Sequence, residues 1–150
     1  QCSNLEGFLL THSLEGGTGS GLTSLLLERL SDEYGKKSKC EISVFPSFDK
    51  SVQSQQIYNS VLALHSSIEH ADLSICLDNA ALNRICTKKL ELNRPNFDDY
   101  NQLIGYFMCS FSSPIRHGGC LSAGLNDIIR NMCPYPRIHF AIPSLAPLQS

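Results

Sequence analysis

Apolar runs and helical periodicities alternate along the first half of the chain. Short, mostly apolar runs at 7–12, 40–45 and 72–77 predict strands. Leucines at i, i+3, i+4 and i+8 predict a helix over 20–34, and a second periodic stretch predicts one over 55–69. This alternation, with short connections, predicts an α/β fold whose parallel sheet is joined by right-handed crossovers.

The second half of the chain is dominated by helical patterns. Asp78 or Asn79 can cap a helix that follows the third strand. The most regular apolar spacing, from Tyr100 to Phe111, predicts a long, well-packed helix, which Pro114 should end or kink near its C-terminal end. The pattern then predicts a loop, a short helix and a strand, at 117–124, 125–132 and 137–142.

Composition and charge narrow the class of protein. With 150 residues, 42% of them hydrophobic and 17% charged, the chain resembles a folded globular unit rather than a disordered tail. A net charge of −2 argues against nucleic-acid binding, and the basic cluster at 35–39 is interpreted as a solvated turn. No apolar run approaches the roughly 20 residues of a membrane helix, and the first residues lack a signal peptide, so a cytoplasmic protein is expected.

The cysteines and histidines do not form a metal-site pattern. The seven cysteines are odd in number, widely spread and without a C-x-x-C pair, which indicates reduced core thiols rather than disulfides or zinc ligands. The five histidines show no ligand spacing and are interpreted as structural or surface residues.

The motif GGTGSG at 16–21 lies between the first strand and the first helix. Glycines permit φ > 0 and close approach, so successive N–H groups can face one concavity at a helix N-terminus, with hydroxyls from Thr18 and Ser20 beside them. This chemistry suits a phosphate. Because no Lys follows and Leu22 replaces the last Gly of G-x-G-x-x-G, the motif is neither a Walker A loop nor a full dinucleotide fingerprint. A plain strand-to-helix turn explains the spacing equally well.

Ligands of open parallel sheets bind beyond the carboxyl ends of the strands. Three segments leave such ends: the loop at 13–21, the loop at 46–54, and Asp78 with Asn79. We therefore expect these three segments to lie side by side.

Longer stretches of the chain resemble the tubulin superfamily of GTPases. The resemblance is carried by GGTGSG, YNSVLALHSSIEHADLSICLDNAALNRIC and PYPRIHF, and it runs through the whole chain. YGKKSK and PYPRIHF look most like alpha-tubulins, whereas LDNAALNRI also looks like gamma-tubulin. The chain is similar to the middle third of such a protein. The resemblance implies a partial GTPase domain at 1–96, a core helix at 97–116, and the start of an intermediate α/β domain at 117–150.

The resemblance also implies the roles of individual residues. The family's phosphate loop matches the six residues of GGTGSG, and its two guanine-reading asparagines match Asn79 and Asn101. Phe97 stands where the family often stacks a Tyr on the base, and Gln56 stands where a Glu near the ribose is common. Without the family, a helix cap and a core residue would be the preferred interpretations of Asn79 and Phe97. The nucleotide-contacting set is therefore Gly16, Gly17, Thr18, Gly19, Ser20, Gly21, Gln56, Asn79, Phe97 and Asn101.

Several positions depart from the family pattern. Glu15 stands immediately before the phosphate loop, where the family has Gly or Ala. The repulsion between a carboxylate and a nearby phosphate costs about 1 kcal/mol per charge pair in water and about 4 kcal/mol at an effective dielectric of 20. In the loop after the core helix Gly119 is retained, but Ser122 and Gly124 replace an Asn and an Asp. Asp127 stands at the acid that meets the nucleotide of the neighbouring subunit, where alpha-tubulins have Glu.

The implied function is that of a GTP-binding constituent of the microtubule cytoskeleton. The expected cofactor is GTP, accompanied by Mg²⁺ whose ligands are not in this segment. The expected protein partners are other tubulin subunits, in heterodimer and polymer contacts, and neither nucleic acid nor a membrane is expected as a partner. The resemblance implies that half of the family's phosphate loops lie upstream of this segment, so the chain alone should bind nucleotide poorly. GTPase activity is weakened or absent if Asp127 is misplaced. Two alternatives stay open: a nucleotide-free interaction module and a dinucleotide-dependent oxidoreductase. The oxidoreductase is less favoured, because the predicted strand at 41–45 does not end in the acidic residue that would bind the ribose of a dinucleotide.

Overall fold

The fold is built around a four-stranded parallel sheet. The computed structural model describes residues 4–46, 53–117, 123–144 and 146 of the chain. The strand order is β1-β2-β3-β4, and every neighbouring pair is parallel. This confirms the predicted α/β class and the first three strands. Their bounds are Gly7–Ser13 for β1, Ser38–Phe45 for β2, Leu73–Asp78 for β3 and Phe140–Ala141 for β4.

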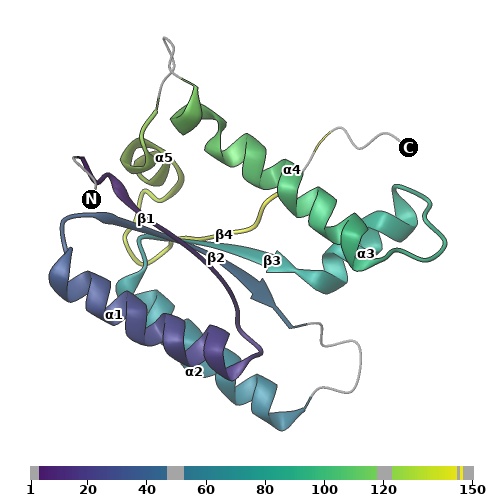
Figure 1. The fold of residues 1–150 in the computed structure, drawn as a ribbon, viewed down its shortest axis with the longest axis horizontal. Coiled ribbons are helices and arrows are strands. Elements are labelled where there is room, and N and C mark those ends of the chain that lie inside the picture. The colour runs from purple at the N-terminus through teal and green to yellow at the C-terminus, as the bar shows by residue number, and fades with distance from the viewer. Residues whose placement is uncertain (1–3, 47–52, 118–122, 145, 147–150) are drawn as a thin grey trace.

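Helices cover both faces of this sheet (Figure 1). The first two α-helices lie side by side on one face, and the long helix α4 and the short helix α5 lie on the other. The predicted helices are all present, and α4 spans the expected residues although it contains Pro114. The bounds are Thr23–Glu33 for α1, Ser54–His70 for α2, Asn79–Lys88 for α3, Phe97–Arg116 for α4 and Leu125–Met132 for α5.

The core lies between the sheet and the α4–α5 layer. Ile42, Leu73 and Ile75 are buried in the middle strands, and Leu125 of α5 packs against them. The apolar face of α4 covers the same cluster with Ile104, Phe107, Met108 and Phe111. The helical period found in the sequence therefore marks the residues that hold α4 on the sheet.

Two details of the sheet differ from the sequence prediction. Strand β4 is shorter than the predicted 137–142, because the chain before it forms a turn in which the Ile138 N–H donates to the Tyr135 carbonyl. Lys39 is not part of a solvated turn, since β2 begins at Ser38 and places Lys39 inside the protein at 5% exposure. Its Nζ atom lies 3.6 Å from a carboxylate oxygen of Asp72, so the buried charge is paired.

The prediction of reduced cysteines is confirmed for the described residues, apart from one position. Cys40 and Cys86 are buried and disulfide-free, whereas Cys109 is exposed on α4 and is not a core thiol. Burial raises the pKa of Cys40 to about 12 and that of Cys76 to about 11. These two thiols are therefore protonated at neutral pH and are poor nucleophiles. Cys2 and Cys120 lie outside the described residues.

Two further sequence expectations concern membranes and domain boundaries. Among the helices of the described ranges, none is both long and apolar enough to cross a bilayer. The division into 1–96, 97–116 and 117–150 stays a prediction. In the structure, β4 from the third of these segments pairs with β3 of the first.

Candidate functional site

The glycine motif forms a compact helical turn at the end of β1. After three bent residues the chain enters a five-residue π-helix, η1 (Thr18–Leu22), which continues directly into α1. The predicted loop at 13–21 is therefore shorter than expected. The prediction of positive φ is wrong, because no glycine among the described residues has one and Gly17 is right-handed helical at φ −59° and ψ −40°. A π-turn inside a helix is a rare feature that is frequent at functional sites.

The four glycines of the turn meet different surroundings. A Cβ atom on Gly19 would lie 2.2 Å from the backbone oxygen of Ser13, so the fold itself requires glycine there. A Cβ atom on Gly16, Gly17 or Gly21 would meet nothing within 4 Å. These three glycines leave the outer side of the turn open, which is the property that a ligand needs to approach a backbone closely.

We expect Gly19→Ala to lower the free energy of unfolding by about 1–3 kcal/mol, because the new methyl group overlaps a backbone atom that cannot rotate away. Urea unfolding of the chain followed by circular dichroism measures this change. The matched control is Gly17→Ala, which adds the same methyl group to a helical position in open space and should raise stability by a few tenths to about 1 kcal/mol. Equal destabilisation by both substitutions would contradict the assignment of Gly19 to the fold.

The electrostatics of the turn favour an anion. The first N–H groups of a helix have no partner within the helix and carry a partial positive charge. The first turns of η1 and α1 contain no acidic residue that would cancel this partial charge.

The two hydroxyl-bearing residues of the turn have different surroundings. The Ser20 hydroxyl donates inward to the Gly16 carbonyl at 2.8 Å, so the expected role of this hydroxyl as a ligand donor is not supported. Thr18 is exposed.

Glu15 precedes the turn and is tied to α2 through its backbone. Its N–H donates to the Ser13 hydroxyl at 3.3 Å, and its carbonyl accepts from the Asn59 side chain at 3.0 Å. A substitution that removes only the carboxylate therefore leaves these two backbone contacts in place.

The sheet brings the turn and Asn79 to one edge. Ser13 pairs with Val44 and Phe45 pairs with Asp78, so β1, β2 and β3 all end on the same side. Asp78 is the helix cap, since its carboxylate accepts from the Ala80 N–H at 2.9 Å. Asn79 is therefore not needed as the cap. Most of the predicted loop 46–54, at 47–52, lies outside the described residues.

Gln56, Phe97 and Asn101 lie near the N-terminal ends of two helices. The Gln56 side chain accepts from the Gln53 N–H at 3.1 Å and caps α2. Phe97 is 78% exposed, which excludes the interpretation as a core residue, and Asn101 is exposed one turn further along α4. The start of α4 lies beside α3 (Figure 1), where the Tyr100 hydroxyl donates to the Asn83 side chain at 3.0 Å.

Asp127 lies at the opposite edge of the sheet. Its helix α5 follows Gly124, and the neighbouring Asn126 side chain accepts a hydrogen bond from Ser38, the first residue of β2. A Cβ atom on Gly7, the first residue of β1, would touch Leu125. Asp127 is exposed and accepts from the Gly124 N–H at 3.3 Å. The chain therefore does not bring Asp127 to its own glycine turn, and Gly119 and Ser122 lie outside the described residues.

A buried polar pair that the sequence analysis did not identify lies beneath the turn. His12 Nε2 lies 2.6 Å from a carboxylate oxygen of Glu41, and the two side chains are 5% and 1% exposed. Burial alone lowers the pKa of His12, but the hydrogen bond and charge of Glu41 and the carbonyl of Gly19 outweigh burial, and the net shift is upward. The available signal was a Glu inside the apolar run at 40–45 and a His at the end of the preceding strand.

This pair predicts a pH dependence of stability. Because the pKa of His12 in the folded chain is raised above its ordinary value of 6.5, the stabilisation is fully present below pH 6.5 and is lost as the pH rises through the folded-state pKa. The difference in unfolding free energy between wild type and the double variant His12→Asn/Glu41→Gln should therefore shrink with rising pH. Urea titrations between about pH 6 and 9 measure it. A difference that grows over this range would contradict the assignment.

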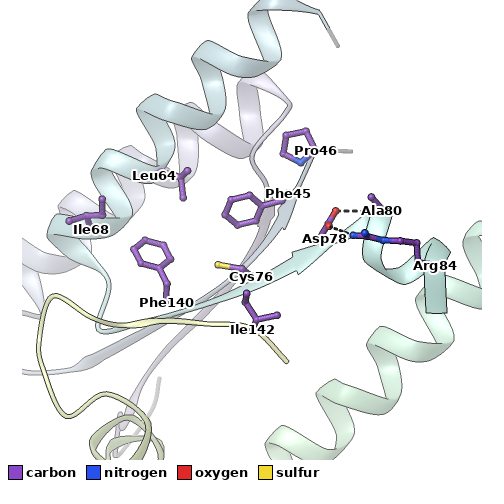
Figure 2. A pocket seen from close by; sticks show the side chains of 10 residues that line it. All are labelled: Phe45, Pro46, Leu64, Ile68, Cys76, Asp78, Ala80, Arg84, Phe140 and Ile142. Carbon is purple, nitrogen blue, oxygen red and sulfur yellow. Dashed lines mark hydrogen bonds and ion pairs between the residues drawn. The ribbon is translucent and has the colours of Figure 1, made fainter. Parts of the chain in front are cut away.

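The structure also contains an apolar cavity of about 630 Å³ (Figure 2). Phe45, Leu64 and Phe140 lie on its walls, and an Asp78–Arg84 ion pair of 3.8 Å lies at one end. Its mostly apolar lining is unsuited to a phosphate. In the described ranges, no group of three or more His, Cys, Asp or Glu side chains could hold a metal ion.

Comparison with known proteins shows which family the chain belongs to. A family model described as "Tubulin/FtsZ family, GTPase domain" matches residues 1–87. The chain belongs to the tubulin/FtsZ family. Among curated tubulins, it is 49% identical over its whole length to the tubulin alpha chain of Eremothecium gossypii and 49% identical to the tubulin alpha-3 chain of Saccharomyces cerevisiae, covering 34% of each. It is 48% identical over 149 residues to the tubulin alpha-3 chain of Zea mays, covering 33% of it.

These comparisons confirm the resemblance to tubulins and its alpha-like character. The tubulin chain described here spans about a third of the length of the curated relatives that it matches. A dinucleotide-dependent oxidoreductase is not favoured, since the glycine motif lies within the matched tubulin segment.

Proposed function

We propose that this tubulin chain contributes to a GTP-binding, polymer-forming constituent of the microtubule cytoskeleton in the cytoplasm. The observation that carries the proposal is the open outer side of the glycine turn at a helix N-terminus without acidic residues. Gly16, Gly17, Thr18, Gly19 and Gly21 would hold the phosphates, mainly through backbone N–H groups. Ser20, whose N–H and hydroxyl both donate to the Gly16 carbonyl, would shape the turn. The partners are other tubulin subunits, in heterodimer and polymer contacts.

The base would be recognised at the carboxyl edge next to α3. The side-chain amides of Asn79 and Asn101 offer both a donor and an acceptor to the guanine edge. The exposed ring of Phe97 supports stacking on the base. Gln56 would face the ribose, in competition with its role as the cap of α2. Mg²⁺ would accompany GTP, with ligands from outside this chain.

Hydrolysis would require two subunits. Strand β1 has seven residues, and a rise of about 3.3 Å per residue separates the two edges of the sheet by roughly 20 Å. This separation supports a role in which the Asp127 carboxylate would orient a water molecule at the nucleotide of the next subunit and not at its own. Asp is one methylene shorter than Glu, and a displacement of about 1 Å can cost roughly 100-fold, so the chain would hydrolyse GTP slowly.

A nucleotide-free interaction module is the second candidate function. Glu15 favours it, because a carboxylate next to the phosphate loop opposes phosphate binding. The intact glycine motif and the two asparagines favour the GTP-binding function.

GTP affinity with and without the Glu15 carboxylate tests the proposal. The protein to use is a full-length chimera, in which this chain replaces the matching 150 residues of the Saccharomyces cerevisiae tubulin alpha-3 chain. We expect the wild-type chimera to bind GTP and Glu15→Gly to bind about tenfold more tightly, because a like charge near the phosphates is removed. Isothermal titration calorimetry measures both affinities.

Two controls separate the possible results. Glu15→Gln removes the charge without adding glycine flexibility, and Glu33→Gln removes a charge at the far end of α1. Binding only after Glu15 is replaced would favour the interaction module. Binding by none of the variants, in a folded chimera, would overturn the GTP proposal.

A further inference from the structure

Glu41 is the centre of a buried hydrogen-bond network that joins four elements. It lies in the middle of β2 at 0% exposure. One carboxylate oxygen contacts His12 of β1 and accepts from the Ser67 hydroxyl of α2 at 2.9 Å. The other oxygen accepts from the Ser74 hydroxyl of β3 at 3.0 Å. A buried carboxylate with these partners is satisfied on both oxygens.

His12 connects this network to the glycine turn. Its Nδ1 atom lies 2.7 Å from the Gly19 carbonyl. Because a carbonyl only accepts, Nδ1 must carry a proton and donate it. Nε2 faces the Glu41 carboxylate, so the second proton is shared within that pair. His12 is therefore a two-sided donor that holds the carbonyl of one residue of η1 against the sheet.

Gly19 is the point at which the turn is fixed. A Cβ atom at this position would overlap the Ser13 carbonyl oxygen, and the Gly19 carbonyl itself is held by His12. Gly16, Gly17 and Gly21 have open space on their outer side. The turn is thus anchored from below at one residue and free above, which is the arrangement that preorganises backbone N–H groups for an anion.

The charged surroundings of His12 are simple. Among the described residues, Glu41 of β2 is the charged group that faces His12, and η1 contributes the Gly19 carbonyl. Serine hydroxyls face Glu41 from α2 and β3. His139 lies behind α2, where its Nε2 atom contacts the Ser67 carbonyl at 3.2 Å.

We infer that His12, protonated by its contact with Glu41, is a positioning residue that presets the glycine turn for phosphate binding. The inference rests on the proposed function, because the anion held by the turn is the phosphate of GTP. His12 does not touch the ligand; it acts through the Gly19 carbonyl.

Two readouts test this role. The variant is His12→Asn/Glu41→Gln, which avoids a buried uncompensated carboxylate; its control, Ser74→Ala, weakens the same network on the oxygen away from His12. In the nucleotide-free chain, amide hydrogen exchange at 16–24 should accelerate about tenfold in the double variant, the loss expected for one charge-assisted hydrogen bond, but not in Ser74→Ala. Affinity of the full-length chimera for GTP should fall by a similar factor of about ten in the double variant only.

The outcomes separate this inference from the proposed function. Faster exchange at the turn together with weaker GTP binding supports both. Unchanged exchange at the turn, or equal effects of the double variant and Ser74→Ala, overturns the positioning role. If the wild-type chimera binds no GTP, the proposed function fails, and the exchange rates alone decide whether His12 holds the turn.

Discussion

Replacing His12 by alanine is expected to lower the free energy of unfolding of the chain by about 3–5 kcal/mol, the range for a buried ion pair that loses one partner. The substitution leaves the buried Glu41 carboxylate, whose side chain is 1% exposed, without the cation that faces it. It also removes the donor to the Gly19 carbonyl. Urea unfolding near pH 6, where His12 is protonated, measures the full effect.

Two variants show whether this loss comes from the buried charge. Glu41→Gln in the His12→Ala background should recover a large part of the stability, because a neutral amide is less costly to bury than a carboxylate. His65→Ala removes a histidine whose side chain is 76% exposed and 4.0 Å from Glu69, and it should change stability by less than about 1 kcal/mol. A loss in His12→Ala as small as that in His65→Ala would contradict the buried pair.

Replacing Asp127 by alanine is expected to slow polymer-stimulated GTP hydrolysis of the full-length chimera by up to about 10²-fold. A positioned general base contributes about 10²–10⁴-fold, and the shorter side chain of Asp has already lost up to roughly 100-fold of that contribution. The carboxylate is exposed at the edge of the sheet opposite the glycine turn, so the effect should appear only when subunits assemble. Phosphate release, measured above and below the assembly threshold, separates the two conditions.

The complementary variant is Asp127→Glu. Restoring the methylene should raise the assembled rate by up to roughly 100-fold if the shorter side chain misplaces the carboxylate. Asp32→Ala, which removes an acid on α1, is the matched control and should leave the rate unchanged. Normal polymer-stimulated hydrolysis by Asp127→Ala would show that this residue does not act on the nucleotide.

Much of the fold follows from periodicity in the sequence. The apolar runs predicted β1, β2 and β3, and the spacing of apolar residues predicted a long helix at α4, because these positions form the core. The bounds 97–116 of that helix came from the resemblance to tubulins. The π-turn at η1 was not predictable, since glycine is compatible with many backbone conformations. The buried Lys39 was misjudged because its partner Asp72 lies on a different part of the chain.

The candidate site was predictable only in part. The glycine motif and the asparagines were visible as residue patterns, and the parallel sheet placed the turn and Asn79 at one edge. The His12–Glu41 pair joins residues on neighbouring strands that are 29 positions apart, and no local pattern predicts such a contact. Only the folded structure shows that Gly19 is required by the backbone, whereas Gly16, Gly17 and Gly21 border open space.

The most direct test of the central claim is the amount of guanine nucleotide that co-purifies with the full-length chimera, released by denaturation and quantified by chromatography. The account predicts that the folded wild type retains GTP or GDP in preference to adenine nucleotides, and that Asn79→Ala reduces this preference. A folded chimera that retains no guanine nucleotide would contradict the account and leave the glycine turn as a structural element only.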